Sequence, residues 1–196
     1  MMQRVAWAKI ALFVGALLPA AILFWQVAFG DPGPDPVAHI VHTTGAWTLR
    51  FLLITLAVTP LRRLSGWNVL IRFRRMLGLY AFFYATLHFL SYLLLDLGAY
   101  WSQLLTDIVK RPYITVGFTA WLLLVPLALT STNAMMRRLG KRWQKLHRLS
   151  YLIAALGVLH FIWLVKADLS EPLIYAAILT LLLLARLPKR NAVQRP

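Results

Sequence analysis

The stretch RMLGLYAFFYATLHFLSYLLL, residues 75–95, decides the fold, because it is long and apolar enough to cross the hydrocarbon core of a bilayer, which takes about 20 residues. Its one charged residue is Arg75 at the start, and its one histidine is His88. Working outward, five further apolar stretches cover residues 8–29, 43–61, 113–130, 148–165 and 171–187. The sequence therefore predicts an all-α, polytopic membrane bundle of six transmembrane helices, with residues 1–196 forming a single domain.

The composition of the whole chain agrees with a membrane protein. Hydrophobic residues make up 60% of it and charged residues 14%, with a mean hydropathy of +0.68. In soluble domains apolar residues average about 45–50% and charged residues about 25%. The absence of cysteine excludes disulfides, cysteine zinc sites, iron–sulfur clusters and thiol nucleophiles. The net charge of +15 is typical of nucleic-acid binding or of topology signals beside anionic lipid headgroups. In so apolar a chain we favour lipid and expect no nucleic acid.

The basic residues predict the orientation of the six helices in the membrane. Of the 21 lysines and arginines, 17 fall at the two termini, between the second and third stretches, or between the fourth and fifth. The positive-inside rule places those segments, and so both termini, in the cytoplasm. All six acidic residues fall on the opposite side. We expect an acidic docking surface there, formed by residues 30–42, 96–112 and 166–171, with Asp31, Asp35 and Asp107 contributing charge. Residues 97–113 fit a short surface helix or a plain loop equally well.

Two histidines fall at one depth on different helices. His88 lies 13 residues above Arg75 and His160 lies 12 residues above Arg148, which is about 20 Å and about 18 Å at the rise of an α-helix. Such a pair suits the axial ligands of a haem held between helices. Two other interpretations stay open, namely structural histidines bonded to backbone carbonyls, and a site for another metal or a proton.

The remaining histidines are less well placed to form a second pair of the same kind. His147 lies 13 residues before His160, so a straight helix does not present both on one face. The third stretch has Arg74 and Arg75 at the level of His147, and these arginines could hold an anionic cofactor. His147 is therefore a ligand of a second haem or part of an inner donor site. His39 and His42 share a helix face at the outer end of the second stretch.

Arg50 is the one lysine or arginine that lies well inside a predicted span, away from its ends. A charged arginine within the bilayer is costly and marks a functional site or a snorkelling side chain. Arg50, together with His42, could contact a haem propionate or a quinone. The competing function for these residues is a small proton or metal transporter that uses the histidines and Arg50, and a third is a non-redox scaffold.

Several motifs resemble the MsrQ family, also called YedZ, of ferric-reductase-like transmembrane proteins. The most specific is LGKRWQKLHRLSYL at 139–152, and the others are DPV at 35–37, HTTG at 42–45, ITLAVTPLRR at 54–63, IRFRRMLGLY at 71–80, ATLHFLSY at 85–92, RPYITVG at 111–117, LTSTNAM at 129–135 and PLIYA at 172–176. Together they span nearly the whole chain.

The resemblance implies an electron-transfer subunit of the bacterial inner membrane, with no independent catalytic site. Such a protein would take electrons from the quinone pool, also through a bound FMN, and pass them to MsrP, a periplasmic molybdenum enzyme that reduces methionine sulfoxide. It implies that His88 and His160 are the axial ligands of haem b iron and that His147 is the third intramembrane histidine. The arginines at 74 and 75 stand where an inner ligand would be in related oxidases, so the resemblance supports one haem and leaves a second open.

Overall fold

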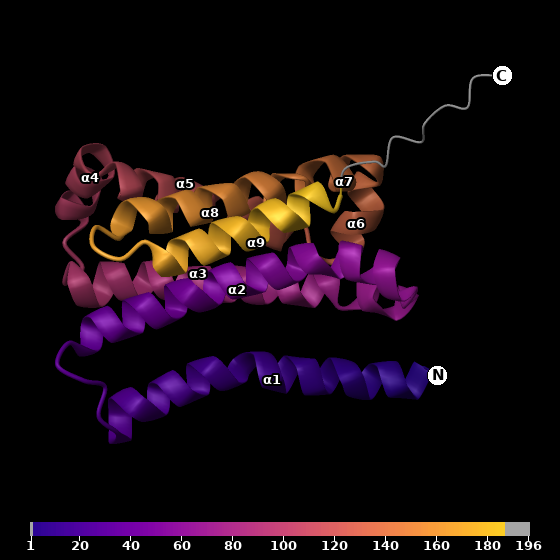
Figure 1. Ribbon diagram of the computed structural model, residues 1–196, viewed down its shortest axis with the longest axis horizontal. Helices are drawn as coiled ribbons and strands as arrows, with labels where there is room; N and C mark the ends of the chain where they lie inside the picture. The colour runs from indigo at the N-terminus through magenta and orange to yellow at the C-terminus, as the bar shows by residue number, and fades with distance from the viewer. Residues whose placement is uncertain (1, 187–196) are drawn as a thin grey trace.

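The computed structural model describes residues 2–186, which form a bundle of helices (Figure 1). In chain order its elements are α1 (Met2–Phe29), α2 (Pro36–Ser65), the 3-10 helix η1 (Asn68–Arg72), α3 (Arg74–Ser91), the π-helix η2 (Tyr92–Asp96), α4 (Trp101–Lys110), α5 (Pro112–Leu129), α6 (Asn133–Leu139), α7 (Lys141–His147), α8 (Leu149–Leu164) and α9 (Ser170–Leu184).

The bundle matches the predicted all-α membrane architecture. Five segments are long and apolar enough to cross a membrane, namely α1, α2, α3 with η2, α5, and α7 with α8. The sixth predicted span, 171–187, corresponds to the shorter apolar helix α9, and its last residue, 187, lies outside the described residues. The fourth and fifth predicted spans agree with α5 and α8 to within one residue at each end.

The second helix is longer than the predicted span 43–61, because it begins at Pro36. The side chain of Asp35 caps it by accepting a hydrogen bond from the Ala38 N–H at 2.9 Å, and proline is tolerated at the first helical position. Gly66 ends the helix in the left-handed conformation, with φ 72°. The extension brings His39 and His42 into the helix.

The two ends of the bundle differ in charge and are called here the acidic end and the basic end. The acidic end holds the α1–α2 connection, α4 and the α8–α9 connection, and all six acidic residues. The basic end holds η1, α6 and α7 and lies on the opposite side in Figure 1. Residues 131–147, between the fourth and fifth predicted spans, fold there into the two short helices α6 and α7.

The core lies where α2 and α3 pack closely together. Phe51 of α2 stacks on Tyr84 of α3 with ring centroids 5.3 Å apart, and Ile153 of α8 is completely buried beside them. The Tyr84 hydroxyl also attaches α1, since it donates to the Ala16 carbonyl at 2.8 Å and accepts from the Ala20 N–H at 3.1 Å. This hydroxyl stands between a carbonyl and an N–H that would ordinarily bond to each other within α1.

Candidate functional site

His88 and His160 are each anchored by one ring nitrogen to a backbone carbonyl. Nδ1 of His88 lies 2.9 Å from the Val41 carbonyl of α2, and Nδ1 of His160 lies 2.7 Å from the Tyr113 carbonyl of α5. A carbonyl only accepts, so each Nδ1 carries the hydrogen and each Nε2 keeps its lone pair. This is the tautomer that binds a metal, with the orienting hydrogen bond that metal-ligating histidines usually have.

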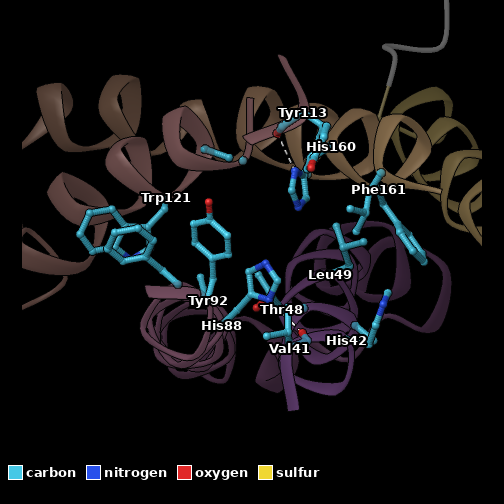
Figure 2. A pocket seen from close by; sticks show the side chains of 18 of the residues that line it. Val41, His42, Thr48, Leu49, His88, Tyr92, Tyr113, Trp121, His160 and Phe161 are labelled. Carbon is cyan, nitrogen blue, oxygen red and sulfur yellow. Dashed lines mark hydrogen bonds between the residues drawn. The ribbon is translucent and has the colours of Figure 1, made fainter. Parts of the chain in front are cut away.

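The two rings face one another across a cavity between α2, α3, α5 and α8 (Figure 2). Their centroids are 6.1 Å apart. A metal bound by both Nε2 atoms at about 2 Å, with each nitrogen roughly 1 Å from its ring centre, needs a centroid separation of roughly 6 Å. The cavity has a volume of about 530 Å³ and is lined by mostly apolar groups, which is within the range of cofactor sites. The placement predicted from helical depth is confirmed; the ligand roles stay a prediction.

Two glycines make room for the imidazoles. A Cβ at Gly117 of α5 would lie 2.7 Å from Nδ1 of His160, and a Cβ at Gly45 of α2 would lie 3.1 Å from Nδ1 of His88. Each ring therefore lies close against the backbone of a neighbouring helix, where a side chain would push it toward the cavity. Sequence reasoning missed both glycines as site residues, because a single sequence does not tell which helix faces which histidine.

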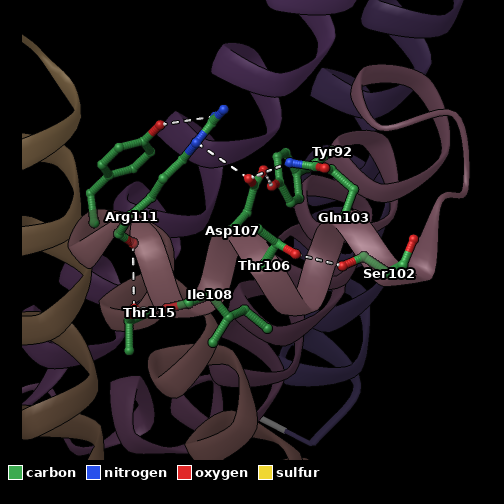
Figure 3. A network of polar contacts seen from close by, with 9 residues as sticks. Tyr92, Ser102, Gln103, Thr106, Asp107, Ile108, Arg111 and Thr115 are labelled. Atoms are coloured by element: carbon green, nitrogen blue, oxygen red, sulfur yellow. Dashed lines mark hydrogen bonds and ion pairs between the residues drawn. The ribbon is translucent and has the colours of Figure 1, made fainter.

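A buried carboxylate organises the acidic end of the cavity (Figure 3). Asp107 of α4 is only 2% exposed and accepts hydrogen bonds from the Tyr92 hydroxyl at 2.7 Å and from Nε2 of Gln103 at 2.8 Å. It also pairs with Nε of Arg111 at 3.4 Å. The expectation that Asp107 contributes surface charge to a docking face is therefore wrong, because its carboxylate points inward and is already paired. Residues 97–113 were expected to form either a short surface helix or a plain loop, and residues 101–110 form the helix.

The same network reaches both histidines. Tyr92 lies one turn beyond His88 and lines the cavity, and Arg111 donates to the Tyr113 hydroxyl at 3.5 Å. That hydrogen bond, and next the Asp107 charge, raise the pKa of Arg111, which therefore stays cationic at the mouth of the cavity. The π-helix η2 at Tyr92–Asp96 gives this region the kind of local irregularity that is frequent at functional sites.

His147 lies apart, at the basic end, and does not line the cavity. Its ring stacks on Trp143 with centroids 3.9 Å apart, and its Nε2 is 3.5 Å from the Ser131 hydroxyl. The regular helical hydrogen bonding is interrupted at Arg148, between α7 and α8, and His147 lines no part of the cavity that His160 faces. Arg74 lies near enough to act on His147 electrostatically, whereas Arg75 bonds to Asn133 of α6.

His42 and Arg50, both from α2, line the cavity, and their contact with a haem propionate or a quinone stays a prediction. Nε of Arg50 donates to the Tyr175 hydroxyl of α9 at 3.1 Å, and its guanidinium lies 4.8 Å from the centre of the Trp47 ring. His39 instead pairs with Gln26 of α1 at 3.3 Å. Within residues 2–186 no three histidine or acidic side chains gather around a point that could hold a metal ion by themselves.

Comparison with known proteins shows the family of the chain. The family described as "Ferric reductase like transmembrane component" matches residues 44–158, which include His88 and His147. The chain is 60% identical to the "Protein-methionine-sulfoxide reductase heme-binding subunit MsrQ" of Xanthomonas campestris pv. campestris strain 8004, over 96% of this chain and 89% of that protein. It is 55% identical to the MsrQ of Herminiimonas arsenicoxydans, over 91% of this chain and 83% of that one. At this similarity over nearly its full length, the chain belongs to the MsrQ family of ferric-reductase-like transmembrane proteins.

Proposed function

We propose that the cavity holds a haem b with His88 and His160 as axial ligands, and that the chain carries electrons through the inner membrane to a protein-methionine-sulfoxide reductase. The observation that carries the proposal is the pair of lone-pair-bearing Nε2 atoms, held by backbone carbonyls with ring centroids 6.1 Å apart in a cavity of about 530 Å³. The relatives named MsrQ are described as heme-binding subunits of that reductase, which supports the same cofactor here.

When bound, haem supplies an iron that changes oxidation state by one electron. The residues of this chain fix where that happens. The Val41 and Tyr113 carbonyls hold the tautomer and direction of the two imidazoles, and Gly45 and Gly117 let the rings lie against the helices. Trp121 and Phe89, stacked at 4.7 Å, form an apolar wall that excludes water. Because such a wall is apolar, a nearby charge has a larger effect on the reduction potential of the bound group.

The electron source and the acceptor complete the proposal. Membrane quinol is the donor, and the periplasmic enzyme MsrP is the acceptor at the acidic end. A second cofactor, either a second haem held by His147 or FMN, occupies the basic end near Arg74 and Arg75. The cluster of arginines there supports an anionic group such as a phosphate. Of the expected docking charges, Asp31 and Asp35 are exposed and remain available for MsrP.

The purified full-length protein tests this function by its absorption spectrum. We expect a Soret band that shifts on reduction with dithionite, and reoxidation of the reduced protein when MsrP and methionine sulfoxide are added together. A colourless protein after expression with a haem precursor would contradict the proposal and favour the alternative, a proton or metal path through the histidines and Arg50.

A further inference from the structure

The helix α4 carries a row of exposed apolar residues at the acidic end of the bundle. Trp101, Leu105 and Val109 follow one another at intervals of four residues, so they lie along one side of the helix. They are 63%, 68% and 84% exposed, and are called here the α4 stripe. Single exposed apolar residues are ordinary, whereas a contiguous apolar patch marks a surface that something else covers.

The α4 stripe is part of a wider apolar side of this helix. At the pitch of an α-helix, the apolar side occupies about 140° of the circumference, and its members are Leu104, Ile108, Trp101, Leu105 and Val109. Leu104, at one edge of this arc, is buried against the bundle and lines the histidine cavity. The rest of the circumference holds polar residues, namely Ser102, Gln103, Thr106, Asp107 and Lys110. The apolar side therefore begins at the bundle and continues outward from it.

Two hydrogen bonds place α4 at the level where its neighbouring spans end, and not above them. The hydroxyl of Tyr92, which lies one turn before the end of η2, donates to Asp107 at 2.7 Å. The hydroxyl of Thr115, in the first turn of α5, donates to the Ile108 carbonyl (Figure 3). The helix α5 has 18 residues, which is about 27 Å and nearly fills a hydrocarbon core about 30 Å thick. The helix α4 therefore lies at the boundary between acyl chains and headgroups.

We propose that the α4 stripe inserts among the lipids of the leaflet at the acidic end, so that α4 is an interfacial helix beside the mouth of the histidine cavity. A helix with one apolar side and a separate polar side lies in the plane of the interface, with its apolar side chains among the acyl chains. Trp101 and the preceding Tyr100, which is 71% exposed, are of the aromatic types that are enriched at this level of a membrane.

The depth of α4 favours lipid over a soluble partner protein as the occupant of the stripe. A soluble partner approaches from the water, and the centre of the stripe lies about 100° around the helix from the exposed polar residues Ser102 and Lys110 and from Thr106 between them. A partner that covered the stripe would have to reach below the headgroups. Because α4 also carries Leu104 and Asp107, lipid on its outer side would hold this helix against the edge of the cavity.

The experiment measures how fast single cysteines on α4 react with a membrane-impermeant maleimide, followed by mass spectrometry. The chain has no cysteine of its own, and the full-length protein is reconstituted in liposomes of phosphatidylethanolamine and phosphatidylglycerol. Leu105→Cys and Val109→Cys test the stripe, and Ser102→Cys is the matched control, since Ser102 is exposed on the polar side of the same helix. We expect both stripe cysteines to react at least about tenfold more slowly than the control, because apolar surroundings disfavour the reactive thiolate.

Other outcomes overturn the proposal in recognisable ways. Equal rates for the stripe and control cysteines would show that the stripe faces water, and protection of those cysteines by an added methionine sulfoxide reductase would then assign the stripe to a docking interface. Slow stripe rates that rise when the protein is diluted in lipid would show that a second copy of the chain covers it. The measurement does not require haem, so a colourless parent would contradict the proposed function alone.

Discussion

At the scale of single residues, the site depends on how closely two helices approach the imidazoles. The depth of His88 and His160 followed from the sequence, because helical rise converts residue number into height. The groups that orient the rings did not follow from it. The Val41 and Tyr113 carbonyls and the two glycines come from helices distant in sequence, and no periodicity tells which helix will be the neighbour.

The glycines give a graded prediction. A Cβ at Gly117 would overlap the His160 ring at 2.7 Å, so Gly117→Ala should displace the ring and strongly lower the haem-to-protein ratio. Gly45→Ala, with its Cβ at 3.1 Å from His88, should lower the ratio less. Gly78→Ala is the control, because the nearest atom would be at 3.8 Å, an ordinary contact. The measurement is haem content after purification. An undiminished ratio in Gly117→Ala would show that this contact does not position His160.

At the scale of elements, the sequence predicted the helices in apolar stretches well and the helices in polar segments poorly. The hydrophobic signal comes from lipid and is strong, which is why α5 and α8 agree with their predicted spans. The early start of α2 had a readable signal in Asp35 and Pro36, a capping residue followed by a proline. The helix α6 had such a signal too, in Thr132, whose hydroxyl accepts from the Met135 N–H at 3.2 Å. Asp107 looked like any other surface acid until its partners were known, namely Tyr92 of η2 and Arg111 between α4 and α5.

Asp107 links α4 to Tyr92 of η2 and to Arg111, which gives an element-scale prediction. Asp107→Asn weakens the pairing with Arg111 and removes a charged acceptor from Tyr92, so the protein should lose about 1–3 kcal/mol of stability. The matched control is Asp96→Asn, since Asp96 is exposed at the same end. Thermal unfolding in detergent measures the difference. If the two variants unfold at the same temperature, the buried network is not what holds α4.

At the scale of the whole molecule, the separation of charge between the two ends sets the orientation that we propose. The chain has no cysteine, so single cysteines can be introduced without background. In intact cells an impermeant maleimide should label Ser102→Cys, at the exposed acidic end, and leave Gln144→Cys, at the exposed basic end, unlabelled until the cells are opened. The reverse pattern would place the acidic end in the cytoplasm and exclude MsrP as its partner.

The central claim is that the cavity between His88 and His160 holds the haem. The position of that haem sets the path of electrons through the whole protein. A bilayer core about 30 Å thick is wide for one electron step, so the position of each cofactor along the bundle decides the route. His147 lies at the other end of the bundle and contacts Trp143 and Ser131 instead. The three histidines should therefore respond differently when they are replaced.

The most direct measurement is the haem-to-protein ratio with the reduced-minus-oxidised spectrum of the parent and of His88→Ala, His160→Ala and His147→Ala. We predict that the first two variants each lose the same low-spin haem signal, because the two rings share one cavity. His147→Ala should keep that signal and lose only a second haem or the response to an inner donor. If the first two variants keep the parent spectrum while His147→Ala is colourless, the ligand assignment is wrong and the haem lies at the basic end.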